Sequence, residues 1–322
     1  MGAHVARDLV NSGCRVTVLD DLSGGFVENI PTGAEFIEGT ILDAAQVDEL
    51  FQARKFTHVF HLAAYAAEGL SHFIKRFNYQ NNLIGSVNLI NASINCQVRC
   101  FVFTSSIAVY GKNQAPVSED LAPAPEDSYG IAKFAVEQEL RVCQEMFGLD
   151  SIIFRPHNVY GELQNIWDPY RNVLGIFMNE IMQGKEMTLF GDGGQTRAFS
   201  YIGDVSPIIA GSIDKPECYN QVFNIGSDDP VSVLDLANRI AKEFGTIPKL
   251  SFEPERNEVR HAYANHTKIA KYFNYKARVD LDEGIGRMAR WAREVGPRVG
   301  RRFDDIEVAK KLPPIWRRLT AN

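Results

Sequence analysis

The sequence predicts an α/β protein with a doubly wound parallel sheet, followed by a smaller α/β lobe. Apolar strand patterns alternate with helix patterns over about the first 160 residues, as in parallel sheets that helices cover on both faces. Several of these strands run into loops rich in Asp, Ala or Ser, and such sheets bind ligands at that edge. After Tyr160-Gly161 the regular alternation ends, which indicates a second lobe.

Each predicted element has its own pattern. Short runs of β-branched and apolar residues predict strands, and apolar residues at helical spacing predict helices. Strands are expected at 15–20, 36–37, 58–62, 99–104 and 151–155, with a short one near 250–252. Helices are expected at 44–53, 73–94, 128–147, 173–182, 231–244 and 281–294.

The strand that should open the sheet is missing from this series. Met1-Gly2-Ala3-His4-Val5 matches the last glycine and the opening helical turn after a Gly-x-x-Gly-x-x-Gly loop. In a doubly wound sheet the strand before such a loop is central, and the loop binds a pyrophosphate at the helix N-terminus. Three explanations stay open: a misassigned internal start, a truncated chain, or another segment that fills the gap.

Composition excludes several classes of function. The chain has 322 residues, 45% hydrophobic and 23% charged, and its net charge of −6 argues against nucleic acid or an anionic membrane as partner. No apolar run reaches the ~18 residues of a membrane span, and no signal peptide pattern is present. Five cysteines without Cys-x-x-Cys spacing predict reduced core thiols in a cytoplasmic protein. The seven histidines show no metal-ligand spacing, and His58 and His61 are expected as packed or loop residues.

Tyr129 and Lys133 are the first candidates for chemistry. Four positions apart in a helical pattern, their side chains share one face of the helix. An ammonium beside a phenol stabilises the phenolate and lowers the pKa of the phenol from its usual value of about 10. A shift of about 3 units needs roughly 4 kcal/mol, so a second positive group, such as an oxidised nicotinamide, is expected nearby. Alone, the spacing equally fits an exposed amphipathic pair.

Asp20 is a candidate for binding a dinucleotide. It ends the first predicted strand, 18 positions after Gly2. An acid there suits the hydroxyls of the adenosine ribose and repels a 2′-phosphate. Asp21 adds negative charge and no arginine follows immediately, so NAD is favoured over NADP. A turn acid at a strand end is the alternative.

Ser106 follows the strand expected at 99–104, within Phe103-Thr-Ser-Ser-Ile-Ala-Val-Tyr-Gly111. A hydroxyl there can bond both a substrate oxygen and the phenolate. Serine clusters after strands are also ordinary turns or caps. Ser106 is therefore a candidate catalytic residue only in combination with Tyr129 and Lys133.

Six short motifs carry a more specific resemblance. They are Asp20-Asp-Leu-Ser, His61-Leu-Ala-Ala, Asn82-Leu-Ile-Gly-Ser, Thr104-Ser-Ser-Ile-Ala-Val-Tyr-Gly, Ser128-Tyr-Gly-Ile-Ala-Lys and Phe154-Arg-Pro-His-Asn-Val-Tyr-Gly. From residue 2 to about 296 the chain resembles the extended short-chain dehydrogenase/reductases of the NAD-dependent epimerase/dehydratase family, and among them nucleotide-sugar epimerases of the UDP-glucose 4-epimerase type. The resemblance implies a Rossmann-like fold, NAD as cofactor, a UDP-hexose as substrate and a homodimer through the helices at 73–94 and 128–147.

The resemblance also implies an organisation. Residues 1–157 would form the dinucleotide-binding domain, to which 197–212 would return. Residues 158–296 would form the nucleotide-sugar lobe, and 297–322 a C-terminal arm. The tryptophan of Leu312-Pro-Pro-Ile-Trp316 is expected to pack on the body of the protein.

Site residues follow by position in the family pattern. Tyr129 would be the catalytic base and acid, Lys133 would bind the nicotinamide ribose and tune Tyr129, and Ser106 would bond the sugar. Further cofactor contacts are implied for Gly2, Asp20, Ile41, Leu62, Ala63, Asn82 and Pro156. Substrate contacts are implied for Asn158, Val173, Arg197, Arg256 and Glu258.

Some positions depart from the family pattern. Arg256-x-Glu258 is one residue shorter than the usual Arg-x-x-Asp, which in the family binds the diphosphate and the nucleoside ribose. Thr40 stands where the family usually has an aspartate that faces adenine. Ala66 stands where some 4-epimerases have a lysine that contacts the cofactor.

Ile107-Ala108, directly after Ser106, narrows the reaction. The related dehydratases carry Asp-Glu there, and decarboxylases tend to carry a glutamate. Neither Ile107 nor Ala108 can move a proton, so dehydration is disfavoured. The predicted function is C4 epimerisation of a UDP-hexose through a transient 4-keto sugar. A keto-sugar reductase with exchangeable NAD(P)H and a nucleotide-binding protein without turnover stay open as alternatives.

Overall fold

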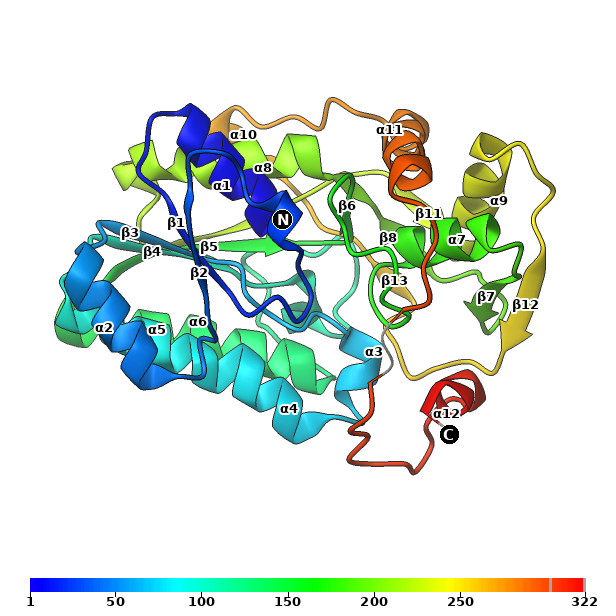
Figure 1. Ribbon diagram of the computed structural model, residues 1–322, viewed down its shortest axis with the longest axis horizontal. Coiled ribbons are helices and arrows are strands. Elements are labelled where there is room, and N and C mark those ends of the chain that lie inside the picture. Colours follow the sequence, from blue (N-terminus) through cyan, green and yellow to red (C-terminus); the bar gives the residue numbers. More distant parts are fainter. Residues whose placement is uncertain (301–302, 321–322) are drawn as a thin grey trace.

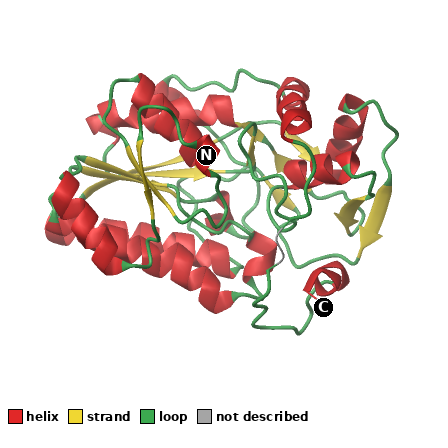
Figure 2. Ribbon diagram, in the orientation of Figure 1, coloured by secondary structure: helices red, strands yellow, loops and turns green. Residues whose placement is uncertain are grey.

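The computed structural model describes residues 1–300 and 303–320, without the side chains of 318–320. Its larger part is a parallel sheet between two layers of helices (Figures 1 and 2). One group of strands pairs in the order β10 (Gln221–Ile225), β5 (Asp150–Pro156), β4 (Cys100–Thr104) and β3 (His58–His61). A second parallel pair consists of β1 (Thr17–Asp20) and β2 (Glu35–Glu38). The predicted fold class is confirmed.

The two groups of strands are not paired with each other. Within residues 1–300 and 303–320, no strand lies between β1 and β3 and no ladder joins them. Val18 of β1 and Val59 of β3 instead line one large cavity. The gap lies where the sequence pattern lacked the central strand of the sheet.

Helices cover both faces of the sheet. On one face lie α2 (Ala44–Arg54), α4 (Lys75–Tyr79), α5 (Gly85–Asn95) and α6 (Ser128–Phe147) (Figure 1). On the other face lie α1 (Gly2–Asn11), α8 (Ile202–Gly211) and α10 (Thr267–Phe273). Because α8 packs against α1 and β10 pairs with β5, segments from beyond residue 200 complete this part of the protein. The division into domains stays a prediction.

The predicted helix at 73–94 is interrupted. It begins at Lys75, and a π-helical turn, η2 (Gln80–Ile84), joins α4 to α5. Asn82 in this turn makes two hydrogen bonds with the loop after β3. Its side-chain amide accepts from the N–H of Tyr65 at 2.8 Å and donates to the carbonyl of Tyr65 at 3.1 Å. The side chain also donates to Asn78 at 2.8 Å. These tertiary bonds explain a widened turn that helical periodicity did not predict.

The smaller lobe packs three helices around short strands. The helices are α7 (Val173–Met182), α9 (Val233–Glu243) and α11 (Leu281–Val295). The paired strands are β7 (Met187–Phe190) with β12 (Leu250–Glu253), β6 (Val159–Tyr160) with β9 (Ser200–Tyr201), and β8 (Thr196–Ala198) between β11 (Pro230–Ser232) and β13 (His261–Ala262). Apolar side chains of α7, α9 and α11 form one buried core. α9 begins two residues later than predicted, because Val231 and Ser232 pair with β8.

The remaining elements are short. They are α3 (Glu68–Ser71), α12 (Pro314–Thr320), and the 3-10 turns η1 (Val27–Asn29), η3 (Ile107–Tyr110), η4 (Ser212–Asp214) and η5 (Pro216–Cys218). The five cysteines are free thiols, three of them buried. Among the described helices, none has the length and apolar character to cross a bilayer.

The C-terminal arm links the two lobes. Arg298 exchanges hydrogen bonds with Asn179 of α7, and Glu307 accepts from the backbone N–H groups of Arg76 and Phe77 in α4. Trp316, 3% exposed, packs edge-on against aromatic rings of both lobes. The expectation that this tryptophan packs on the body is confirmed. Residues 301–302 and 321–322 of the predicted arm lie outside the described residues.

Candidate active site

A cavity of about 1790 Å³ opens at the carboxyl ends of the parallel strands and continues into the smaller lobe. Tyr129, Lys133 and Ser106 line it, as do Asp20 at one end and Arg197 at the other. The edge of the sheet that the sequence indicated as a ligand site therefore borders a space large enough for a dinucleotide and a second ligand.

The side chains of Ser106, Tyr129 and Lys133 meet at the start of α6. The Ser106 hydroxyl is hydrogen-bonded to the Tyr129 hydroxyl. The Lys133 Nζ lies 5.9 Å from the centre of the Tyr129 ring and donates to the carbonyl of Thr104 at 2.8 Å. Lys133 is therefore fixed to the end of β4, directly before the serine cluster.

Two local features bring these residues together. The Asp127 carboxylate caps α6 by accepting from the N–H of Gly130 at 2.8 Å, which fixes where the helix begins. A side chain at Gly130 would place its Cβ 2.7 Å from the carbonyl oxygen of Ala108. A residue without Cβ thus lets α6 approach the turn that carries Ser106.

The electrostatics of the pair correct one expectation. Lys133 was expected to lower the pKa of the Tyr129 phenol. Burial instead raises the pKa of Tyr129, although the hydrogen bond from Ser106 opposes the shift. Burial also lowers the pKa of Lys133 to about 7, against the opposing charge of Glu137. A phenolate here needs the second positive group that the sequence argument had called for.

Most residues that the family pattern links to the cofactor line the cavity: Gly2, Asp20, Ile41, Leu62, Ala63 and Pro156. The Asp20 carboxylate accepts from the N–H of Leu22 at 2.8 Å, and burial raises its pKa. Asn82 differs, because it is 1% exposed and bonded to Tyr65 rather than lining the cavity. Asn82 therefore supports the loop after β3 from behind.

The five residues linked to the substrate also line the cavity: Asn158, Val173, Arg197, Arg256 and Glu258. The Glu258 carboxylate lies 3.4 Å from Arg197 and 3.2 Å from Arg256, so it pairs with both guanidinium groups. Arg256 stacks 3.9 Å from the centre of the Phe190 ring. The three side chains form a cluster in which positive charge exceeds negative charge.

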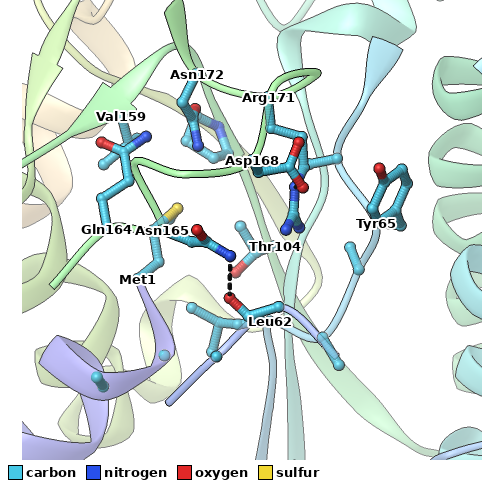
Figure 3. A pocket seen from close by; sticks show the side chains of 18 of the residues that line it. Met1, Leu62, Tyr65, Thr104, Val159, Gln164, Asn165, Asp168, Arg171 and Asn172 are labelled. Atoms are coloured by element: carbon cyan, nitrogen blue, oxygen red, sulfur yellow. Dashed lines mark hydrogen bonds and ion pairs between the residues drawn. The ribbon is translucent and has the colours of Figure 1, made fainter. Parts of the chain in front are cut away.

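Residues 162–172 form a wall of the cavity that sequence patterns did not specify. Arg171 pairs with Asp168 at 2.8 Å, as Figure 3 shows, and stacks over the Tyr65 ring at 4.7 Å. Asn165 donates to the carbonyl of Gly24 at 3.3 Å. These contacts join positions far apart in the chain, so no local motif could have revealed them.

Glu68 is a further residue of the cavity wall that the sequence patterns did not indicate. It begins α3 in the loop after β3 and lines the cavity. Burial, reinforced by the nearby Asp127 carboxylate, raises its pKa to about 7. The available signal was one charged residue within Ala66-Ala67-Glu68-Gly69, a segment otherwise made of small residues.

His61 is a packed histidine, as expected, and lies 2% exposed at the end of β3. The Ser86 hydroxyl donates to the carbonyl of Asn82 at 3.0 Å and therefore accepts from the His61 Nε2 at 2.8 Å. The His61 Nδ1 has no partner within the described part of the chain. Burial and the Lys133 charge lower the pKa of His61 to about 3, so the native protein keeps this ring neutral.

Protonation of unfolded His61 should destabilise the protein in acid. The unfolded ring binds a proton below about pH 6.5, whereas the native ring does so only near pH 3. Between these values stability falls as pH falls, and His61 should account for about 2 kcal/mol between pH 7 and pH 5. The measurement is urea unfolding at both pH values for wild type and His61→Gln, which keeps a donor toward Ser86.

The matched control is His261→Gln, which replaces an exposed histidine. It should show the same acid destabilisation as wild type, while His61→Gln shows less. Equal losses in all three proteins would contradict the account of His61.

Comparisons with known proteins identify a family and several similar enzymes. A model of the NAD dependent epimerase/dehydratase family matches residues 1–226. A putative UDP-glucose 4-epimerase of Methanocaldococcus jannaschii is 31% identical over 296 residues, covering 90% of this chain and 94% of that protein. The crystal structure of Thermotoga maritima UDP-glucose 4-epimerase with UDP-glucose superposes with a TM-score of 0.85 at 32% identity, covering 91% and 96% of the two chains.

A solved structure with a different substrate is also similar. The UDP-glucuronic acid 4-epimerase of Bacillus cereus, in complex with UDP-glucuronic acid and NAD, has a TM-score of 0.84 and 26% identity. The match covers 91% of this chain and 96% of that chain. Proteins of this shape therefore include enzymes for neutral and for acidic sugar nucleotides.

Proposed function

Because the chain belongs to the NAD-dependent epimerase/dehydratase family, we propose that it inverts C4 of a UDP-hexose, with NAD as its cofactor. The observation that carries the proposal is the cluster of Ser106, Tyr129 and Lys133 in the cavity. Ile107 and Ala108, which follow Ser106, supply no second acid or base for elimination of water.

The residues of the cavity fit NAD. The Asp20 carboxylate, which suits ribose hydroxyls, lies at the end of β1, and the Lys133 ammonium of α6 is bonded to the end of β4; both line the same cavity. The N-terminus of α1 lies beside it, and a Cβ at Gly2 would meet no atom within 4 Å. This helix end therefore leaves room for a pyrophosphate, which favours the exposed N–H groups of a first turn.

The proposed reaction begins with a proton transfer. As a phenolate, Tyr129 takes the proton of the C4 hydroxyl and becomes the phenol, which later returns that proton, while Ser106 orients the sugar oxygen by a hydrogen bond. When bound, NAD supplies the acceptor and donor of the C4 hydrogen and, in its oxidised form, positive charge beside the phenol. Lys133 stays fixed to the Thr104 carbonyl throughout and stabilises the phenolate.

The cluster of Arg197, Arg256 and Glu258 would bind the nucleotide end of the substrate. Two guanidinium groups share one carboxylate, so a diphosphate would complete the charge balance and can accept bidentate hydrogen bonds. Because the substrate is held at this end, its sugar ring is free to turn over. The opposite face of C4 can then point toward the cofactor.

We also propose a cytoplasmic homodimer that uses α5 and α6. Apolar side chains are exposed along these helices and the preceding turn: Ile84, Ile131, Val142, Met146 and Phe147. Exposed apolar side chains on two neighbouring helices support an interface between two copies.

The proposed function predicts conversion of UDP-galactose to UDP-glucose by the purified protein with added NAD. Proton NMR of the anomeric signals measures the product. If no UDP-glucose forms, and UDP-glucuronate and UDP-N-acetylhexosamines are also left unchanged, the epimerase proposal is wrong. Stoichiometric consumption of reduced cofactor with a keto-sugar nucleotide would instead identify a reductase.

A further inference from the structure

We propose that Glu68 determines the sugar: its carboxyl group accepts hydrogen bonds from the hydroxyls of a neutral hexose and excludes hexuronic acids. This inference rests on the proposed function, since it concerns the sugar ring that Tyr129 would act upon. It assigns a specificity role to a residue outside the Ser106, Tyr129 and Lys133 cluster.

The first argument is that the α3 turn is tied to the catalytic helix. The Ser71 hydroxyl donates to the carbonyl of Glu68 at 2.7 Å. The same hydroxyl accepts from the backbone N–H of Tyr129 at 3.2 Å. Two hydrogen bonds therefore connect the backbone of Glu68 to that of Tyr129, and the position of Glu68 relative to the catalytic phenol is fixed.

The second argument is that the other side of the turn contacts the arginine cluster. A Cβ at Gly69 would lie 3.3 Å from the Arg256 Nη1 and 3.3 Å from the Trp316 ring. Glu68 and Gly69 are thus placed between Tyr129 and Arg256. With C4 of the sugar at Tyr129 and the diphosphate at Arg256, the group between them faces the sugar ring.

The third argument is the state of the carboxyl group. It lines the cavity and, in the described part of the chain, has no hydrogen bond or ion pair of its own. The Asp127 carboxylate nearby differs, because it caps α6 through the N–H of Gly130. The residue is half-buried at the cavity surface, so the Glu68 carboxyl group is available for ligand hydroxyls.

The charges around Glu68 indicate that the site favours a neutral hexose over a hexuronic acid. The titratable and charged groups that act on it or feel its charge are Asp127, Glu258, Arg197, Arg256, His72 and Tyr129. Glu258 already pairs with both arginines, and a bound diphosphate would take up their remaining positive charge. A uronate carboxylate beside Glu68 and Asp127 would then meet two like charges, whereas neutral hydroxyls would find an acceptor.

The test compares UDP-glucose with UDP-glucuronate for wild type and Glu68→Gln. Calorimetry in the presence of NAD gives both dissociation constants, and kcat/KM is measured where turnover occurs. Wild type should prefer UDP-glucose by at least about 100-fold, as expected for a juxtaposition of like charges. Glu68→Gln should lower that preference by at least about tenfold. Glu145→Gln makes the same chemical change at a carboxylate outside the cavity, which pairs with Arg141 at 2.7 Å, and it should keep the wild-type preference.

A pH series on wild type gives a second readout that needs no variant. Because the pKa of Glu68 is raised to about 7, lowering the pH from 8 to 6 protonates the group and should strengthen UDP-glucuronate binding relative to UDP-glucose. The inference is overturned if wild type binds both sugar nucleotides equally, if Glu68→Gln keeps the full preference, or if the preference is independent of pH. Failure to epimerise any UDP-sugar would instead overturn the proposed function, and the dissociation constants would still decide the role of Glu68.

Discussion

Tyr129→Phe is expected to lower kcat for C4 epimerisation by about 10²- to 10⁴-fold, the range attributed to a positioned general acid or base. The change removes one oxygen that bonds Ser106 and leaves the ring in place beside Lys133. The Lys133 ammonium is bonded to the Thr104 carbonyl and is therefore not free to take the place of the missing hydroxyl. The measurement is the rate of UDP-glucose formation from UDP-galactose, together with the affinity for UDP-glucose, which should stay close to wild type.

The matched control is Tyr275→Phe. Tyr275 is also buried, and its hydroxyl donates to the carbonyl of Gly226 at 2.9 Å, outside the cavity. This variant loses one hydrogen bond of similar quality and should retain kcat. If Tyr129→Phe were as active as Tyr275→Phe, Tyr129 would not be the proton-transfer residue.

Glu137→Gln is expected to lower the free energy of unfolding by about 3–5 kcal/mol, the usual cost of removing one partner of a buried ion pair. Glu137 on α6 accepts from Arg155 on β5 at 2.9 and 2.5 Å, and the two side chains are 3% and 4% exposed. Ser105 also donates to Glu137 at 2.5 Å. The pair therefore fixes α6, and with it Lys133 one turn earlier, against β5 and the loop that carries Ser106.

Urea unfolding at pH 7 measures this effect, with Glu145→Gln as the control. Glu145 pairs with Arg141 one turn away on the exposed face of the same helix, and an exposed pair contributes less than about 1 kcal/mol. A loss for Glu137→Gln no larger than that for Glu145→Gln would show that the buried pair does not anchor α6.

Local signals predicted the elements that carry the chemistry. α6 spans the predicted residues 128–147, because Asp127 caps its start and Gly148 ends it in a left-handed conformation with φ of 72°. α7 likewise spans the predicted 173–182. Caps and periodicity are encoded within a few residues, so a sequence pattern is sufficient for such helices.

Elements that depend on distant partners were missed. α8 contains Pro207, which interrupts a helical pattern, yet packing against α1 stabilises it. β10 is a short strand whose place is set by pairing with β5. The π-helical turn depends on hydrogen bonds from Asn82 to the loop after β3. None of these partners can be inferred from neighbours in sequence.

The residues of the candidate site also divide into those with local sequence signals and those that depend on distant contacts. Tyr129, Lys133 and Ser106 could be predicted because spacing and strand order place them together. Glu68 and Arg171 could not. The position of Glu68 depends on Ser71, which bonds its carbonyl and the N–H of Tyr129, and that of Arg171 on Asp168 and Tyr65. Residues that hold a reaction centre follow the fold, whereas residues that select a substrate depend on how loops from both lobes pack.

The central claim is that this chain inverts C4 with NAD by removing and returning the same hydrogen. The direct measurement uses UDP-galactose labelled with deuterium at C4, the purified protein and NAD in ordinary water, with the product analysed by NMR and mass spectrometry. We expect UDP-glucose that retains the deuterium at C4. Loss of the deuterium to solvent or to released cofactor, or the absence of UDP-glucose, would contradict the claim.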